Sequence, residues 1–284
     1  MRASFKKSIF GGYLLLLIIN VIELRSGILL GVVQLLLGLG VCLPKLLNVF
    51  DLPAIRRYDR VIKVVFSLSL LLGIVYRWYN APNHLFTLFF LSLLLFYAED
   101  EEYFTDNLRW ILIVVMGFAT MHKVFNPNFM SGDFIAFRMA SGDFFRPLIN
   151  SGLMPEIKEV IAQNVENIRT FVRTDPVLGK TIILNIGTLP YEGLRQPFVY
   201  SIIGMELLLA LGFVFLDRSK IVLGFLLLFV ASIGLVVSEY EFAATLLYMG
   251  FVLCPITYRN LKLGYRNIFL LYAFFALLDN LFWR

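Results

Sequence analysis

The sequence predicts an all-α protein, a single helical membrane domain over residues 1–284 that crosses the bilayer about eight or nine times. Hydrophobic residues make up 59% of the chain and charged residues only 16%, against roughly a quarter in an average soluble domain. Apolar runs that approach the roughly 20 residues needed to cross a bilayer recur along nearly the whole chain. These runs are continuous and do not alternate with polar residues, which favours helices over a transmembrane β-barrel.

The individual spans are predicted from apolar runs that end at charged residues, Pro or Asn. They cover residues 8–22, 27–43, 61–78, 84–98, 106–123, 198–216, 221–238, 242–258 and 267–283. The first two runs are short and are joined by Glu23 to Gly27, so either a tight hairpin or one broken helix fits them. The basic residues ahead of the first run resemble a signal peptide, but no small-residue cleavage site follows, and we expect a retained signal anchor.

The positions of Lys and Arg predict the orientation. With a cytoplasmic N-terminus, the external loops before residue 124 carry only Arg25 and Arg77. Many more basic residues lie at or beside the cytoplasmic segments: Arg2, Lys6, Lys7, Lys45, Arg56, Arg57, Arg60, Lys63, Arg218, Lys220, Arg259, Lys262 and Arg266. Positive charge is retained on the cytoplasmic side, so segment 124–197, between spans five and six, is predicted to be an extracytoplasmic insert. The net charge of +5 then fits anionic membrane lipids and requires no nucleic acid. We expect a multi-pass protein of a bacterial inner membrane.

The insert contains one amphipathic stretch. Within residues 155–173, apolar residues recur at 157, 160, 161, 165, 168 and 172, which is the period of a helix with one wet face. This helix is expected to lie on the membrane surface or on the top of the bundle, with a lid over a cavity as the alternative. The motif SGDF occurs at Ser131 to Phe134 and again at Ser141 to Phe144, where Ser or Asp is suited to cap free amides at a turn or helix start.

Two charged residues in apolar spans are candidate functional residues. Lys123 ends the fifth span on the outer side, where its ammonium can extend to lipid headgroups or, turned inward and desolvated, act as a base. His122 precedes it by one position, so the two side chains point about 100° apart and only one of them can line a cavity. Glu206 lies several residues inside the sixth span, where a carboxylate is costly unless it is protonated, paired or faces a polar cavity.

The stretch GFATMHKVFNPNFMSG resembles a segment of the HTTM family, the membrane domain shared with vitamin K-dependent gamma-carboxylase. In that family a helix ends in small or aromatic residues, followed by a Lys, a turn rich in Asn or Asp, an aromatic residue and a Gly. A second stretch, GMELLLALGFVFLDRSKIVLGFLLLFVASIGLVVSEYEF at 204–242, resembles the family's Glu-bearing span with the basic loop and span that follow. It is also similar to DoxX-like membrane proteins.

The resemblance implies that Lys123 is a base, because the carboxylase lysine at this place drives hydroquinone oxidation. It therefore also implies a quinone-like, lipid-soluble substrate or cofactor. Two features depart from the family pattern: the turn after Lys123 has one extra apolar residue, and Ala231 and Ser232 stand in the span where many members have a His. The lumenal domain with which the carboxylase engages its peptide substrate has no counterpart here, so we do not expect carboxylation of protein glutamates.

Two hypotheses about function remain open. The first is a membrane-embedded enzyme acting on a quinone-like substrate in an outward-facing cavity, with Lys123 as base and Glu206 or His122 as polar partners. The second is a non-catalytic subunit or scaffold of a larger membrane complex, with other proteins as partners. Other chemistry is not indicated: Cys42 and Cys254 are isolated, motifs for metal or nucleotide binding are missing, and we expect no metal site.

Overall fold

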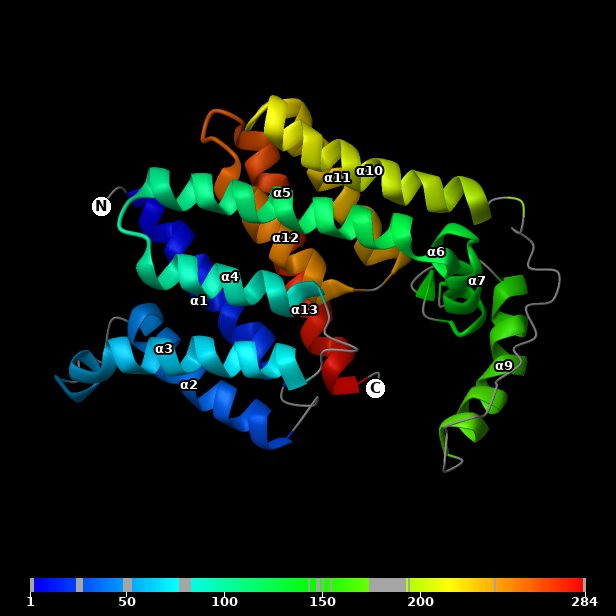
Figure 1. Cartoon of the computed structure of the whole chain (residues 1–284), viewed down its shortest axis with the longest axis horizontal. Helices are drawn as coiled ribbons and strands as arrows, with labels where there is room; N and C mark the ends of the chain where they lie inside the picture. The colour runs from blue at the N-terminus through cyan, green and yellow to red at the C-terminus, as the bar shows by residue number, and fades with distance from the viewer. Residues whose placement is uncertain are drawn as a thin grey trace.

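The computed structural model describes residues 3–23, 28–47, 53–76, 83–142, 144–146, 149, 151–153, 155–173, 193, 195–237 and 239–282. Over these residues the secondary structure is helical, without strands, in agreement with the predicted all-α class (Figure 1). Each predicted span has a helical counterpart: α1 (Ala3–Glu23), α2 (Ile28–Leu47), α3 (Pro53–Tyr76), α4 (Asn83–Tyr97), α5 (Glu101–Phe125), α10 (Arg195–Phe215), α11 (Lys220–Val236), α12 (Tyr240–Leu253) and α13 (Arg259–Phe282). Helices α1 and α2 are separate and pack against each other, so the first two runs form a helical hairpin.

Helix α12 lies at the centre of the bundle (Figure 1). It packs against α1, α4, α5, α11 and α13, and all its residues from Phe242 to Gly250 are buried. This explains why a helix of only 14 residues is apolar on every side: it contacts other helices all around. The main hydrophobic core is formed by α12 with the inward faces of its neighbours.

Tyrosine side chains fit against glycines where these helices approach most closely. A Cβ atom built at Gly250 would overlap the ring of Tyr265, and one at Gly234 would overlap the ring of Tyr272. The hydroxyl of Tyr265 donates to the Leu223 carbonyl oxygen at 2.6 Å, so the buried phenol has a hydrogen-bond partner. The missing Cβ atoms therefore let bulky, hydrogen-bonded rings lie directly on neighbouring helix backbones.

The predicted insert forms three described helices, α6 (Pro127–Met130), α7 (Asp133–Ala140) and α9 (Pro155–Arg173), beyond the end of the bundle where α5 ends and α10 begins (Figure 1). A second, smaller apolar cluster joins the insert to the start of α10, and it is made of Phe129, Ile135, Met139, Phe144, Ile149, Ile157 and Val199. Helix α9 has the predicted bounds and packs against α7. Ile157 is buried, whereas Lys158 and Glu159 are exposed. The described part of its apolar face therefore packs within the insert.

Both SGDF motifs lie in turns, as predicted, and each follows the end of a helix. The first also begins the next helix, because α7 starts at Asp133. Ser131 and Ser141 are the C-terminal caps of α6 and α7, and the following Gly132 and Gly142 have φ angles of 80° and 78°. Such left-handed backbone at the end of a helix strongly favours glycine. In the first copy the Ser131 hydroxyl also accepts the Asp133 amide at 3.3 Å, in line with the predicted capping. Asp143 of the second copy lies outside the described residues.

Among the described helices, α5 and α10 are both long and apolar enough to cross a membrane. Shorter apolar stretches lie at Ser8–Ile19, Gly31–Pro44, Leu85–Tyr97, Lys220–Val236 and Tyr240–Leu253. Helix length and composition thus support two spans, and the predicted eight or nine spans remain a prediction. In α5 and α10 only 22% and 28% of the most apolar 18-residue window is buried inside the protein.

Candidate functional site

Helix α5 carries the candidate lysine and has a well-defined start and end. Asp100 caps its N-terminus by accepting the Tyr103 amide at 2.7 Å, and two acidic residues occupy the first turn. His122 and Lys123 lie in the last turn, where positive charge interacts favourably with the helix dipole. The acidic EDEE stretch therefore lies at the N-terminus of α5 and the His-Lys pair at its C-terminus, which are the ends where the helix dipole stabilises negative and positive charge.

The sequence NPN redirects the chain immediately after Lys123. Asn126 is the C-terminal cap of α5 and the N-terminal cap of α6, where its side-chain oxygen accepts the amides of Asn128 and Phe129 at 3.0 and 3.3 Å. Pro127 occupies the first turn of α6, where its missing N–H costs no hydrogen bond. As a result the buried Phe129 ring lies beside the end of α5, with its centroid 5.7 Å from the Lys123 Nζ atom.

Lys123 and Glu206 form an ion pair between α5 and α10. The Nζ atom donates to both carboxylate oxygens of Glu206, at 2.6 and 2.9 Å. The Glu206 side chain is 6% exposed and the Lys123 side chain 19%, so the carboxylate is enclosed and the ammonium is partly reachable. Lys123 thus turns inward from the end of α5, and Glu206 has the charged partner that a carboxylate in an apolar helix requires.

The start of α10 is held against the insert near this pair. The Gln196 side-chain amide donates to the carbonyl oxygens of Met130 and Ser131, at 3.2 and 2.8 Å. Arg195 forms a longer ion pair with Asp133, at 3.6 Å. These contacts hold α6 and the start of α7 next to α10, and therefore limit the positions that Phe129 can take beside Lys123.

The pair is held by two charge-assisted hydrogen bonds. The carboxylate of Glu206 accepts both of them from the Lys123 amine, and such bonds are shorter and stronger than those between neutral groups. The arrangement therefore links α5 and α10 electrostatically, and the Lys123 Nζ atom is already engaged in this contact.

The other sequence-predicted residues lie outside this pair. The His122 side chain is exposed, as its position about 100° from Lys123 on the helix requires. At the positions where the family pattern has a His, the Ala231 carbonyl oxygen accepts the Tyr272 hydroxyl at 2.8 Å, and the Ser232 hydroxyl donates to the Phe229 carbonyl within α11. Both positions therefore serve contacts within the bundle.

A second ion pair links α5, near its N-terminal end, to the loop that follows α10. The Arg109 guanidinium donates to the Asp217 carboxylate, in the loop that follows α10. Partial burial raises the pKa of Asp217, but the hydrogen bond from Arg109 and the charges of Arg218 and Arg109 outweigh it and hold this pKa below its usual value. Sequence reasoning missed this pair, although an arginine inside an apolar span is costly unless it finds an acidic partner.

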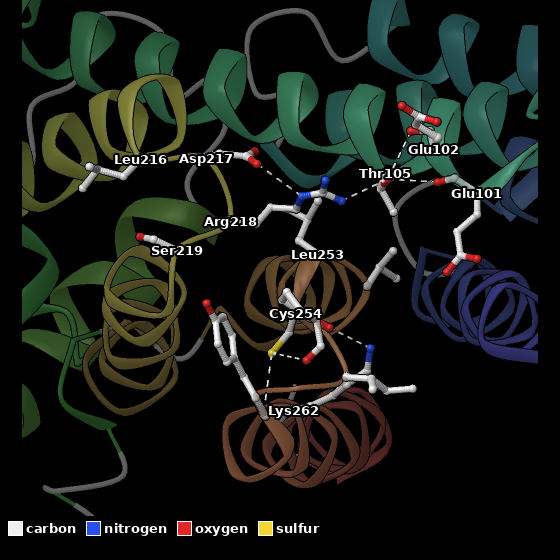
Figure 2. A pocket seen from close by; sticks show the side chains of 14 residues that line it. Glu101, Glu102, Thr105, Leu216, Asp217, Arg218, Ser219, Leu253, Cys254 and Lys262 are labelled. Atoms are coloured by element: carbon white, nitrogen blue, oxygen red, sulfur yellow. Dashed lines mark hydrogen bonds and ion pairs between the residues drawn. The ribbon is translucent and has the colours of Figure 1, made fainter.

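A cavity of about 700 Å³ adjoins this second pair (Figure 2). It lies where α5, α11 and α13 begin and where α10 and α12 end. Its polar walls contain Glu101, Glu102, Thr105, Asp217, Arg218, Ser219 and Lys262. The packing of α9 against α7 places that helix beyond the far end of the bundle, so α9 is not a lid over this cavity.

Among the residues that the structure describes, no group of three or more His, Cys, Asp or Glu residues is placed to hold a metal ion. Comparison with known proteins assigns no family: no protein-family model matches the chain, and neither a curated protein nor a solved structure matches it.

Proposed function

We propose that the chain is a multi-pass integral membrane protein that serves as a non-catalytic subunit of a larger membrane complex. The observation that carries the membrane assignment is the low burial of α5 and α10, because only 22% and 28% of their apolar windows are buried inside the protein. The core helix of a soluble protein is mostly buried, and neither helix is near the N-terminus as a signal sequence would be. Lipid or a partner protein is the natural cover for such surfaces.

The exposed residues on these helices have the chemistry expected for that environment. Phe118, Phe125, Leu208 and Phe215 are 60–77% exposed on α5 and α10. Large exposed apolar surfaces are unfavourable in water, and lipid tails or the apolar surface of another subunit remove that cost. The charge distribution supports a cytoplasmic N-terminus and an extracytoplasmic insert, as in the predicted topology.

The non-catalytic role is supported by the Lys123–Glu206 ion pair. The Lys123 amine donates to both carboxylate oxygens of Glu206, so both charged side chains are engaged in linking α5 to α10. The pair keeps α5 and α10 in register near the insert, leaving the outer faces of both helices for contacts. This is the property expected of a scaffold on which other membrane subunits assemble.

Topology is the first test. We expect the protein to stay in the membrane pellet after alkaline carbonate extraction. In intact cells, a membrane-impermeant maleimide should label Lys158→Cys on α9, and should label Lys220→Cys at the start of α11 only after permeabilisation. Cys42 and Cys254 are buried and form the background control. Release by carbonate, or the reverse labelling pattern, would contradict the proposal.

The subunit role is tested by purification in mild detergent. A stoichiometric partner that co-elutes with the full chain supports the role, whereas a monomer that carries bound quinone contradicts it. Lys123→Arg keeps the charge and the ion pair but removes a group that can be deprotonated. The subunit role therefore predicts that this variant keeps its partner and supports the same cellular phenotype as the wild type.

The enzyme with Lys123 as base is the second candidate. It is favoured by one observation: the Lys123 side chain is 19% exposed, which leaves room for a substrate to approach it beside the Phe129 ring. In this case Lys123→Arg would still assemble normally but would lose turnover of the quinone-like substrate. Normal assembly with lost turnover thus selects the enzyme, and an unchanged phenotype selects the subunit.

A further inference from the structure

Helices α11 and α13 pack against each other and run in the same direction. The Tyr265 hydroxyl donates to the Leu223 carbonyl oxygen at 2.6 Å, and the Tyr272 hydroxyl donates to the Ala231 carbonyl oxygen at 2.8 Å. The second contact lies about two turns further along both helices, which therefore run parallel. Both helices begin at the end of the bundle that the charge distribution assigns to the cytoplasmic side.

One side of this helix pair is exposed. The helices touch where Leu227 lies against Gly264, because a Cβ atom built at this glycine would lie 3.1 Å from the leucine side chain. Two parallel right-handed helices place one stripe each on the same side of such a contact, and here these stripes form what we call the α11–α13 face. Its members are Lys220, Gly224 and Leu228 on α11, and Asn260, Asn267 and Leu271 on α13. All of them except Gly224 are exposed, and a Cβ atom built at Gly224 would meet no atom within 4 Å.

The cytoplasmic end of the α11–α13 face carries positive charge. Lys220 is exposed at the first residue of α11. Arg266 is exposed on α13, and its Nε and Nη2 atoms donate to the Asn267 side-chain oxygen at 3.3 and 3.2 Å. This oxygen holds the guanidinium beside the face but carries no charge. In the part of the chain that the structure describes, neither Lys220 nor Arg266 forms an ion pair with a carboxylate.

The neighbouring elements supply no acid to neutralise these cations. Helix α11 contains no Asp or Glu, and α13 contains none before Asp279. Helix α12 packs against both, but its one acidic residue, Glu241, lies in the first turn at the opposite end of the bundle. The carboxylate of Asp217, three residues before Lys220, is engaged by Arg109 and Arg218. The uncompensated charge favours an anionic partner.

The face becomes apolar away from its cytoplasmic end. Leu228 and Leu271 are 63% and 47% exposed, and both lie further along their helices than the two cations. The open position of Gly224 leaves the backbone of α11 accessible between Lys220 and Leu228. Cations at the start of two apolar helices, followed by exposed hydrocarbon, match a phospholipid in both its parts, the charged headgroup and the acyl chains.

We propose that the α11–α13 face binds an anionic phospholipid of the cytoplasmic leaflet. The phosphate diester contacts Lys220 and Arg266, since ammonium and guanidinium groups bind phosphate through charge-assisted hydrogen bonds. An acyl chain lies over Gly224, between Leu228 and Leu271. The proposal rests on the membrane location argued above and adds to it a binding site for one class of lipid.

The test measures lipid binding to the full-length protein in detergent by native mass spectrometry. The probes are phosphatidylglycerol, phosphatidylcholine and phosphatidylethanolamine with identical acyl chains. We expect phosphatidylglycerol to bind at least about fivefold more tightly than the two zwitterionic lipids, which is the effect of roughly one basic residue at a membrane surface. Equal binding of the three lipids would overturn the proposal. So would competition by soluble glycerophosphoglycerol as strong as that of the lipid, because it would assign the site to a free phosphoester.

Matched variants locate the binding to the α11–α13 face. Lys220→Gln and Arg266→Gln should each lose most of the preference for phosphatidylglycerol, whereas Arg266→Lys keeps the charge and should retain it. Arg60→Gln is the control, because Arg60 is an exposed cation of α3, which packs against α2 and α4. This variant should bind all three lipids like the wild type. A preference that survives both Lys220→Gln and Arg266→Gln would contradict the assigned site.

The unfolding temperature in detergent completes this comparison. Lys220 and Arg266 are exposed, so their variants should unfold at the wild-type temperature while their lipid preference changes. If the wild type is instead a dimer that Lys220→Gln dissociates, the face is a protein contact and the proposal is wrong.

The outcome is separable from the proposed function. A chain that resists carbonate extraction but shows no preference for phosphatidylglycerol contradicts only the lipid site. Release from the membrane by carbonate contradicts the membrane location itself.

Discussion

The Nζ atom of Lys123 lies 2.6 Å from Oε1 and 2.9 Å from Oε2 of Glu206, so the end of α5 is bound to the middle of α10 by a largely buried ion pair. Charges removed from water stabilise a fold only as long as each has its partner. The sequence separation of 83 residues shows that this pair depends on the packing of two distant helices.

Removing one charge of this pair is expected to lower the stability of the protein more than removing both charges. Lys123→Met leaves a buried carboxylate unpaired, and Glu206→Leu leaves the ammonium without an acceptor. Each single change should cost roughly 2–3 kcal/mol, somewhat less than the roughly 3–5 kcal/mol for fully buried pairs, because Lys123 is partly exposed. The double variant should be more stable than either. Thermal unfolding in detergent gives the comparison, and additive losses would contradict the expectation.

Gly234 is expected to tolerate no larger residue. A Cβ atom at this position overlaps the Tyr272 ring, so Gly234→Ala should destabilise the protein by roughly 1–3 kcal/mol. Gly224 lies on the same helix with no atom within 4 Å of a built Cβ. Gly224→Ala should therefore be neutral or slightly stabilising, because alanine favours the helix. Equal unfolding temperatures for the two variants would show that Tyr272 does not pack on α11 as described.

Asn126 is expected to hold the turn that follows Lys123. In Asn126→Ala the amides of Asn128 and Phe129 lose their acceptor, which should cost about 1 kcal/mol. Limited proteolysis of the insert should then become faster. Asn128→Ala provides the control, because that side chain is exposed and makes no hydrogen bond among those described. Similar proteolysis of both variants would argue against the capping role of Asn126.

The Arg109–Asp217 pair is expected to make stability depend on acid pH. The folded-state pKa of Asp217 is below the ordinary value of 3.8, so the carboxylate stabilises the fold above that value. This contribution is lost as the pH falls through the lower folded-state pKa. Half of the Asp217 side chain is exposed, so the effect should be at most roughly 1 kcal/mol.

The measurement for this pair compares unfolding temperatures of the wild type and Asp217→Asn between neutral pH and about pH 3. At neutral pH the wild type should unfold at a higher temperature than Asp217→Asn. This difference in unfolding temperature should shrink on acidification. A difference that stays constant, or grows as the pH falls, would contradict the assigned ion pair.

The predicted helices agree with the structure because hydrophobic periodicity is a local property. The amphipathic pattern of residues 155–173 predicts both bounds of α9, Pro155 and Arg173. The SGDF motifs show what a short sequence motif does not predict by itself. Their composition marks a turn, but whether a Ser ends one helix or begins the next depends on the backbone of the following glycine, as at Gly132.

The candidate site was only partly predictable. Lys123 and Glu206 could each be singled out, because a charge in an apolar helix requires a partner. Their mutual contact could not be predicted, since it depends on which helices are neighbours. The sequence did not indicate the contact between Arg109 and Asp217 for the same reason. Arg109 lies in a predicted span and Asp217 in a loop, and neither position by itself indicates the other as its partner.

Composition and the order of apolar runs alone determined that the chain is helical and largely apolar, because the cost of unpaired backbone groups and of exposed hydrocarbon acts on every segment separately. Only the tertiary structure decided that Lys123 meets Glu206, that Tyr265 lies on Gly250, and that charges from α5, α13 and the loop after α10 surround one cavity. Such contacts join residues far apart in the chain. Their partners are chosen by shape and packing between helices, which no single segment specifies.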